Sequence, residues 1–440
     1  MNFPMVAGLR NRNRRRQRGA ATLVLTMLLL FGTSVVVLFL NRGLLFEQRI
    51  SVNQLWATSA REVAEAGAEW ATGMLNTPYT VNGADCAFTG TTTAPFRSRY
   101  VQTQLGAATP SSAFAPATNV YPGCSLSANN TLSCHCPAAP GNPATTAVAS
   151  LSAVLPKFTV QFLAVDNNSI KVRSTGCLAT AGSCSANDAT SSAGADAKAV
   201  VEVILKLKPV MRAVPAAALT AGGTVDLSGS YNLVNNDVPT NGILVDAGST
   251  ITQGNGVSLA SIPGVPSANA LIGNDGSLSS LSTADPSCTN STLFNAYFGS
   301  TMAQYAAEPT TKSLSCSSAS DCESQLTTAY NDGWRAFYFT SDLHLSGNQT
   351  LGSEVQPVTI VTPMAMDING SWNIYGLLFA NSTNLNALGT GAANIYGAEV
   401  ACNNVNVNGN GTLTYDPKVL INVARNNARL VRVPGSWRDR

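Results

Sequence analysis

The feature that most constrains this chain is an uncharged apolar run directly behind a basic segment. Residues 1–19 contain six arginines and no acidic residue, and Ala20 to Leu40 then continue for 21 residues without a charge. As a helix this run would be about 31 Å long, enough to cross a bilayer, with the arginines on the cytoplasmic side. A secretory signal is disfavoured, because the small residues precede the apolar run instead of following it.

The helical pattern continues beyond the apolar run. Large apolar residues recur at spacings of seven and four from Leu45 to Met74, with charged residues between them, as is typical of an amphipathic helix. No proline occurs between Ala20 and Thr77, and Pro78 supplies a stop. The sequence therefore predicts one helix over residues 20–76, roughly 84 Å long, whose first half faces lipid or like helices and whose second half packs on a domain.

The N-terminus carries a family resemblance. Gln17-Arg18-Gly19, the Ala-Ala-Thr-Leu-Val-Leu that follows, and the later stretch from Ala64 to Glu69 (AEAGAE) resemble the N-terminus of type IV pilins, most closely the PilX-type minor pilins. In that family a prepilin peptidase cleaves after the glycine and methylates the new N-terminus. The resemblance therefore implies cleavage between Gly19 and Ala20, with N-methylation of Ala20.

The resemblance also implies a location and partners. The precursor would cross the inner membrane once, with its C-terminal part in the periplasm, and the mature protein would join a pilus at the cell surface. The implied partners are other minor and major pilins, which contact the N-terminal helix, the prepilin peptidase, and the inner-membrane pilus assembly machinery.

One position departs from the pattern of major pilins. They have a glutamate fifth after the cleavage point, where this chain has Val24. In those proteins the glutamate is thought to neutralise the N-terminal amine of the preceding subunit inside the apolar fibre core, where an unpaired charge is costly. A subunit that enters first has no predecessor, so Val24 predicts a position at or near the pilus tip or in a priming complex.

All ten cysteines lie beyond residue 85, and their even number predicts disulfides in an oxidising compartment. Two local pairs are predicted, Cys177 with Cys184 and Cys316 with Cys322. The connectivity of the other six stays open: Cys86, Cys124, Cys134, Cys136, Cys288 and Cys402. A zinc site at Cys134-His135-Cys136 is disfavoured, because the cysteines are too closely spaced and the only other histidine is His344, so neither a metal nor a cofactor is expected.

Residues 77–212 predict a disulfide-stapled β domain of the pilin type. The part up to residue 157 has the composition of loops. Phe158 to Phe162 then alternate with polar neighbours, a turn follows at residues 166–168, and Ile170 to Ser174 return as a hairpin. Ala197 to Val210 predicts a long strand beside it. The predicted fold class is α+β, with the long helix packed on an antiparallel sheet.

Residues 213–424 predict a mainly β C-terminal domain. The stretch that begins at Asn373 (NIYGLLFAN) is echoed 21 residues later at Asn394 (NIYGAEVAC). Such a repeat predicts the stacked coils of a β-solenoid, with Gly or Asn where φ is positive. A β-sandwich with Asn-Gly turns is the alternative. The stretch from Asp367 to Pro417 also looks like the C-terminal region of many PilX-type proteins.

Two further segments complete the chain. Residues 261–340 are predicted to be a partly helical insertion, in which Leu293 to Tyr305 mark a helix with an aromatic face. Packing of this face onto the solenoid is favoured over contact with a partner. Residues 425–440 carry five arginines. A solvated basic tail that folds back on an acidic surface is favoured over a grip on single-stranded DNA, because Asp439 interrupts the basic pattern. Without residues 1–19 the net charge falls from +2 to −4, which gives no strong nucleic-acid signal.

The leading functional interpretation is a minor pilin whose helix inserts among other pilin helices and initiates or caps the fibre. The alternative is a tip adhesin or DNA-uptake pilin whose C-terminal domain binds a surface or ligand. A membrane-anchored β-helix enzyme acting on glycans is less favoured, because Asp367 and Glu399 are the only acids between Met364 and Tyr415 and do not occupy corresponding repeat positions. The chain is not expected to be an enzyme.

Overall fold

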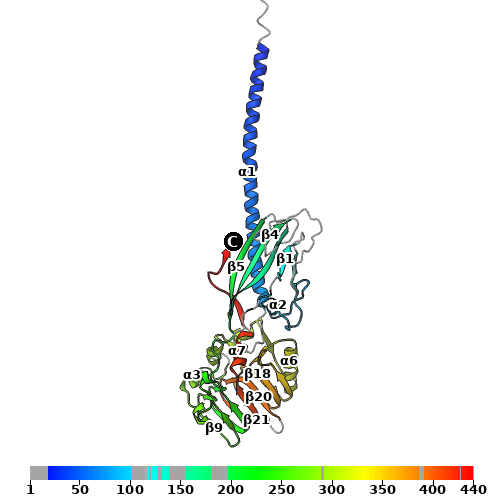
Figure 1. The fold of residues 1–440 in the computed structure, drawn as a ribbon. Coiled ribbons are helices and arrows are strands. Elements are labelled where there is room, and N and C mark those ends of the chain that lie inside the picture. Colours follow the sequence, from blue (N-terminus) through cyan, green and yellow to red (C-terminus); the bar gives the residue numbers. More distant parts are fainter. Residues whose placement is uncertain are drawn as a thin grey trace, which may run out of the picture.

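The computed structural model describes residues 18–101, 114, 116–117, 120–126, 131–137, 155–179, 184, 197–288, 292–385, 391–426 and 428–439. A long helix, an antiparallel sheet against its second half and a parallel β-rich domain follow one another along the molecule (Figure 1). The predicted α+β fold class is confirmed. Residues 1–17 of the predicted leader lie outside the described residues.

Helix α1 runs without interruption over Arg18–Leu75, 58 residues in all. Its first half stands clear of the rest of the molecule, and its second half lies along the antiparallel sheet (Figure 1). Pro78 follows shortly after its end, where the fixed ring and missing N–H of proline prevent further helix. The long unbroken pattern of the sequence thus corresponds to one helix.

The antiparallel sheet has seven strands in the order β2-β1-β3-β4-β5-β22, with β23 also pairing with β5. The strands are β1 (Gly123–Leu126), β2 (Leu132–His135), β3 (Leu155–Asp166), β4 (Ser169–Ala179), β5 (Ala197–Lys208), β22 (Arg429–Arg432) and β23 (Arg438–Asp439). The short helix α2 (Phe96–Tyr100) lies beside it. The predicted hairpin is β3 and β4, and its turn is fixed by the Asp166 carboxylate, which accepts a 2.7 Å hydrogen bond from the Asn168 N–H.

The C-terminal domain is built on a 16-stranded sheet in which every described strand pairing is parallel. Its first strands are β6 (Leu219–Ala221), β7 (Val225–Val234), β8 (Val245–Ala247), β9 (Ile251–Gln253), β10 (Ser258–Ala260) and β11 (Leu271–Ile272). The later strands are β12 (Thr311–Leu314), β13 (Ala336–Phe339), β14 (Leu343–Leu345), β15 (Asn348–Leu351), β16 (Val358–Val361), β17 (Ala365–Ile368), β18 (Ser371–Ala380), β19 (Ser382–Leu385), β20 (Ala393–Ala401) and β21 (Val405–Tyr415).

The 21-residue echo is a strand pairing. Asn373 of β18 lies opposite Asn394 of β20, and the register holds to Ala380 opposite Ala401. The approach is close, because a Cβ on Gly376 would overlap the carbonyl of Val358 on the next strand, and Gly397 has a φ of +139°. Equivalent residues of successive repeats therefore stack on one another, as the repeat predicts.

The order of strands in the stack differs from their order in the sequence. β6 and β7, the first strands of the domain, pair with β20 and β21, the last. From there the chain moves outward through β8 and β11, then re-enters at β12 at the opposite edge and returns through β13, β16 and β18 to β20. The repeats alone did not predict this closure of the last strands onto the first.

The remaining helices surround the parallel sheet. They are η1 (Val238–Thr240), η2 (Ser267–Ala270), α3 (Gly276–Ala284), α4 (Thr292–Phe298), α5 (Met302–Ala306), α6 (Ala319–Asn331) and α7 (Pro417–Asn426). The prediction of one aromatic helix was wrong, since Gly299, with a φ of +65°, separates α4 from α5. Its predicted packing is observed, because Phe294 meets Phe379 of β18 edge to face at 5.0 Å between ring centroids. The predicted insertion, residues 261–340, also contains strands β11, β12 and β13 of the sheet.

The basic C-terminus is not a solvated tail. β22 and β23 pair antiparallel with β5, with Lys208 opposite Arg429. The parallel domain is therefore inserted between two neighbouring strands of the antiparallel sheet. Leu430 is buried against the sheet, whereas Arg429 and Arg432 stay exposed and form ion pairs with Glu308 and Glu69.

Candidate functional site

The first half of α1 presents an apolar surface that the described chain leaves uncovered. Ala21–Leu40 has a mean hydropathy of 2.7 and is the one described helical segment long and apolar enough to cross a membrane. Leu30 is 69% exposed, Phe31 71% and Phe39 74%. Apolar surface in water costs about 25 cal/mol per Å², so a continuous surface of this kind requires a lipid or protein environment.

The predicted processing residues lie at the start of this helix. Gly19 and Ala20 are in the first turn of α1, which contains no acidic residue. Val24 follows one turn later and is 58% exposed. Cleavage between Gly19 and Ala20, and methylation of Ala20, stay predictions.

The second half of α1 packs its backbone closely on the sheet. Ala60, Ala64, Ala68 and Ala71 are fully buried, and their spacing of four, four and three residues puts them on one face. This face meets Gly176 of β4, where a Cβ would overlap the backbone of Ala60 and Ala64. Small residues on both elements therefore fix the position of the helix on the sheet.

Aromatic side chains pack beside this contact. The Trp70 ring lies 5.6 Å from the Phe96 ring in an edge arrangement and 5.4 Å from that of Phe158 on β3. Such pairs add about 0.5–1.5 kcal/mol each to the burial of their area. Helix, sheet and α2 consequently form one core.

The end of α1 is tied to the returning C-terminus. The Asn76 side chain donates to the Leu430 carbonyl at 2.9 Å and accepts from the Leu430 N–H at 2.8 Å. Arg432 forms an ion pair with Glu69 on the same helix. Residues more than 350 positions apart in the sequence thus join the end of α1 to the C-terminal strand β22.

All ten cysteines are paired. The pairs include Cys177 with Cys184 and Cys316 with Cys322, and the other three are Cys86 with Cys136, Cys124 with Cys134, and Cys288 with Cys402. Both cysteines that flank His135 are therefore occupied. No group of three or more His, Cys, Asp or Glu side chains that could hold a metal is found among the described residues.

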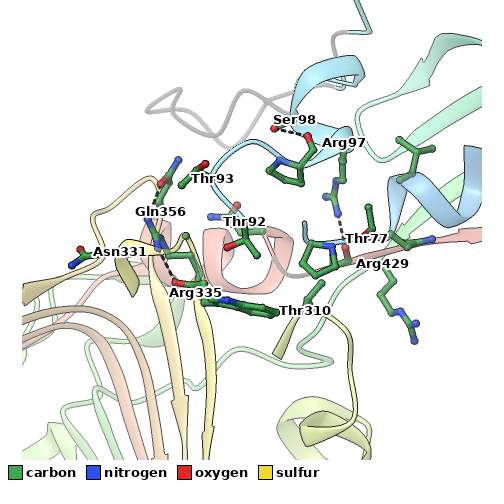
Figure 2. A pocket seen from close by; sticks show the side chains of 18 residues that line it. Thr77, Thr92, Thr93, Arg97, Ser98, Thr310, Asn331, Arg335, Gln356 and Arg429 are labelled. Carbon is green, nitrogen blue, oxygen red and sulfur yellow. Dashed lines mark hydrogen bonds between the residues drawn. The ribbon is translucent and has the colours of Figure 1, made fainter. Parts of the chain in front are cut away.

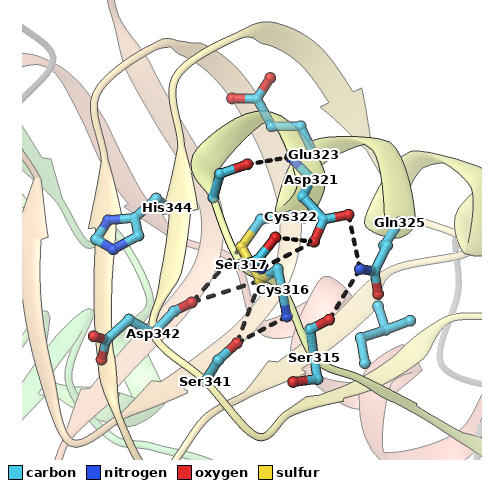
Figure 3. The surroundings of a disulfide bond; sticks show 12 residues. Ser315, Cys316, Ser317, Asp321, Cys322, Glu323, Gln325, Ser341, Asp342 and His344 are labelled. Carbon is cyan, nitrogen blue, oxygen red and sulfur yellow. Dashed lines mark hydrogen bonds between the residues drawn. A yellow bond between two sulfur atoms is a disulfide. The ribbon is translucent and has the colours of Figure 1, made fainter.

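The Cys316–Cys322 disulfide joins the strand end before α6 to the first turn of that helix (Figure 3). Asp321 accepts from the Ser317 N–H at 2.9 Å and from the Gln325 side chain at 2.9 Å. These hydrogen bonds, the one from Gln325 foremost, lower the pKa of Asp321. The network fixes the start of α6. Both of its thiols are in the disulfide, and its described residues contain no set of metal ligands.

The two acids considered for glycan chemistry are in different environments. Asp367 lies on the outer side of β17, 2.9 Å from Nδ1 of His344, and accepts from the Asn384 side chain at 2.7 Å. Glu399 is fully buried inside the parallel domain, where desolvation raises its pKa to about 7. They therefore do not form a pair of carboxylates across one site.

Sequence reasoning missed the C-terminal strands and the Asn76 contact. The four residues of β22 (RLVR) do not alternate between polar and apolar, so the sequence gives no strand signal there that could decide against a basic tail. Nothing local marks Asn76, because its partner is distant in the sequence.

Comparisons with known proteins bear on the helix. Residues 18–69 match the family model described as PilX N-terminal. No curated protein matches the chain. The crystal structure of the competence-associated pilin ComZ from Thermus thermophilus aligns with 88% of this chain and 97% of its own, at 11% sequence identity and a TM-score of 0.21. A superposition at that TM-score carries no conclusion about the fold.

Proposed function

We propose that this chain is a minor pilin of a type IV pilus, and the match of residues 18–69 to the PilX N-terminal family model supports the proposal. The observation that carries the proposal is the division of α1 into an uncovered apolar half and a half locked to the sheet. Such a helix can be held in the inner membrane as a single-pass precursor and then packed among the helices of other minor and major pilins. In this proposal prepilin peptidase cleaves between Gly19 and Ala20 and methylates Ala20.

The proposed position is at or near the pilus tip, in an initiating role with the inner-membrane assembly machinery. Val24 supports it, because a first subunit needs no glutamate to neutralise a predecessor. The shape of the molecule agrees, since the parallel domain lies at the end opposite to the exposed half of α1 (Figure 1). A bulky distal domain is easier to accommodate at a fibre end than within its length.

The second candidate function is surface binding by the parallel domain. Its parallel strands, stacked at a 21-residue repeat, support the interpretation of a β-solenoid. Extended stacked surfaces of this kind are common binding platforms. The tip adhesin and the DNA-uptake pilin are both forms of this candidate, and neither excludes the assembly role.

The first test is N-terminal sequencing of the protein from wild-type cells and from cells that lack prepilin peptidase. The expected result is methylated Ala20 in the wild type and an uncleaved leader in the mutant. A shared start at Met1 would overturn the assignment.

Immunogold labelling tests the proposed tip position. It should find the protein at fibre ends, and labelling along the whole fibre in major-subunit amounts would contradict the tip position.

The second test separates assembly from binding. Because Lys208 lies opposite Arg429, residues 209–428 can be replaced by Asn-Gly, which closes a two-residue hairpin and keeps β22 and β23. If the parallel domain only binds a surface, this variant should still support pilus assembly. Truncation after residue 212 is the matched comparison, and it should fail in either case because it removes β22 and β23, the two strands that pair with the outer edge of β5.

A further inference from the structure

The parallel domain ends in three outer strands, β9, β10 and β11. β9 and β10 pair with β7, and β11 pairs with β8, each on the side away from β20 and β21. No described strand pairs with their outer edges, so all three edges are open at the same end of the domain. This surface, residues 251–272, is the open end. It lies at the end of the molecule farthest from α1 (Figure 1).

Apolar side chains are left partly uncovered at the open end. Those of Ile251, Leu259 and Leu271 contact the core but stay partly exposed. The residues that pair with them on the strands beneath are at most 1% exposed; they are Val225, Leu233 and Val245. The outermost apolar side chains therefore lack the layer of side chains that covers their partners.

The opposite end of the same domain is covered. Helix α6 packs there on the outer strands β12 and β14. The Glu323 carboxylate of this helix accepts hydrogen bonds from the N–H groups of Ser346 and Gly347, which directly follow β14. Leu343 and Leu345 of β14 are fully buried. The two ends of the domain thus differ, because a helix satisfies and covers one of them and not the other.

The open end also lacks the charges that usually protect a strand edge. Residues 247–274 contain no Asp, Glu, Lys, Arg or His. Exposed edges in soluble proteins are commonly protected by charged side chains or by a covering element, and stacked strands need a polar or covered last layer. An uncharged edge with partly exposed apolar side chains is therefore suited to contact with another protein.

We propose that two copies of this chain bind each other end to end through their open ends. A partner for this surface has to present unpaired strand edges around a partly uncovered apolar centre. Within the described chain the end covered by α6 does not do so, which excludes head-to-tail stacking, and the open end does. The matching surface is therefore the same end of a second copy.

The geometry of such a contact is self-consistent. A two-fold axis across the open end reverses the strand direction, so the outer strands of the two copies meet antiparallel and can exchange backbone hydrogen bonds. Because the open end is uncharged, the two copies do not repel each other there. The contact is independent of the pilin assignment, since α1 contributes no residue to it and lies at the other end of the molecule (Figure 1).

The test measures the mass of the full chain, purified in detergent, by light scattering after gel filtration over a range of concentrations. The expected result is a concentration-dependent dimer. A monomer at every concentration would overturn the proposal.

A pair of charge variants locates the contact. Gln253 on β9 is exposed, although it lies opposite fully buried Leu227, so it is at the centre of the proposed interface. Gln253→Lys and Gln253→Glu should each weaken the dimer at least about tenfold, because like charges then face each other. An equal mixture of the two variants should restore it, and rising salt should reduce the difference.

Gln349→Lys is the matched control. Gln349 is also an exposed glutamine on an outer strand, β15, but at the opposite end of the domain, so its substitution should leave the dimer unchanged. Thermal unfolding of each variant verifies that the domain is intact. A dimer that is insensitive to Gln253→Lys, or that responds equally to Gln349→Lys, would place the contact elsewhere, such as on α1, and would contradict the proposal. Failure of the mixed charge variants to associate would do the same.

Discussion

The two halves of α1 differ in the size and the burial of their apolar side chains. Between residues 21 and 40 the helix carries large apolar side chains, such as Leu30 and Phe31, that are about 70% exposed. Between Ala60 and Ala71 it carries alanines that are fully buried on the antiparallel sheet. The apolar side chains of the first half can be buried only by lipid or by another protein. Those of the second half are buried within the domain itself.

The difference shows how one helix can anchor the protein in apolar surroundings and also set the orientation of its globular parts. Large exposed side chains give affinity for any apolar surroundings but little geometric precision. Small side chains at a backbone-to-backbone contact give precision, because a close-packed interface permits one position. The precision of the second half therefore determines how the globular parts are held relative to the apolar half.

The largest expected effect is on the exposed half. Leu30→Lys should weaken membrane insertion by about 2.5–3.5 kcal/mol, because it places a charge near the centre of the apolar run. Membrane association is measured by extraction of the precursor at alkaline pH, with Leu30→Met as the volume-matched control. Thermal unfolding of the globular parts should not change, and a clear decrease would mean that this half packs on its own chain.

The next effect is on the buried half. Gly176→Val should lower the free energy of unfolding by about 2–3 kcal/mol, because the added side chain meets the backbone of Ala60 and Ala64, which cannot rotate away. Denaturant unfolding of the purified protein measures it. Retained stability would show that the helix and sheet are not in backbone contact.

A smaller effect is expected at the end of the helix. Asn76→Ala removes both hydrogen bonds to Leu430 and should cost about 1–2 kcal/mol. Hydrogen exchange of the Leu430 amide should accelerate together with that loss. Slow exchange in the variant would mean that pairing with β5 alone holds β22.

The smallest effect is a stabilisation. Gly73 lies in the packed half of α1, yet a Cβ there would meet nothing within 4 Å. Gly73→Ala should therefore raise the free energy of unfolding by about 0.5–1 kcal/mol, since alanine loses less backbone freedom in a helix. It is also the control for Gly176→Val, and a destabilised Gly73→Ala variant would show that the tight contact extends further along the helix.

Local pattern was sufficient for the features that depend on neighbouring residues. The unbroken periodicity up to Pro78 predicted α1, and the alternation around the turn at Asp166 predicted the β3–β4 hairpin. The echo between Asn373 and Asn394 predicted strands that stack in register. Each of these signals repeats at the period of the element that it forms.

Local sequence pattern gave a wrong or no prediction where the structure depends on contacts with distant segments. Arg429 to Arg432 read as a basic tail because nothing near them indicates that β5 has an open edge. The single aromatic helix was wrong because Gly299 breaks it, and a lone glycine is tolerated in many helices. The pocket between the two domains was not predictable at all, since its lining residues, such as Arg97 and Arg335, come from distant parts of the chain (Figure 2).

By itself the sequence determined that this protein has a long, partly uncovered helix, a β hairpin and stacked repeats, because hydrophobic period and proline placement act over a few residues. Only the tertiary structure decided that the parallel domain is inserted between β5 and β22 and that β6 closes onto β20. The physical reason is that a strand edge accepts whichever segment buries the most apolar surface there. That choice depends on the whole folded chain.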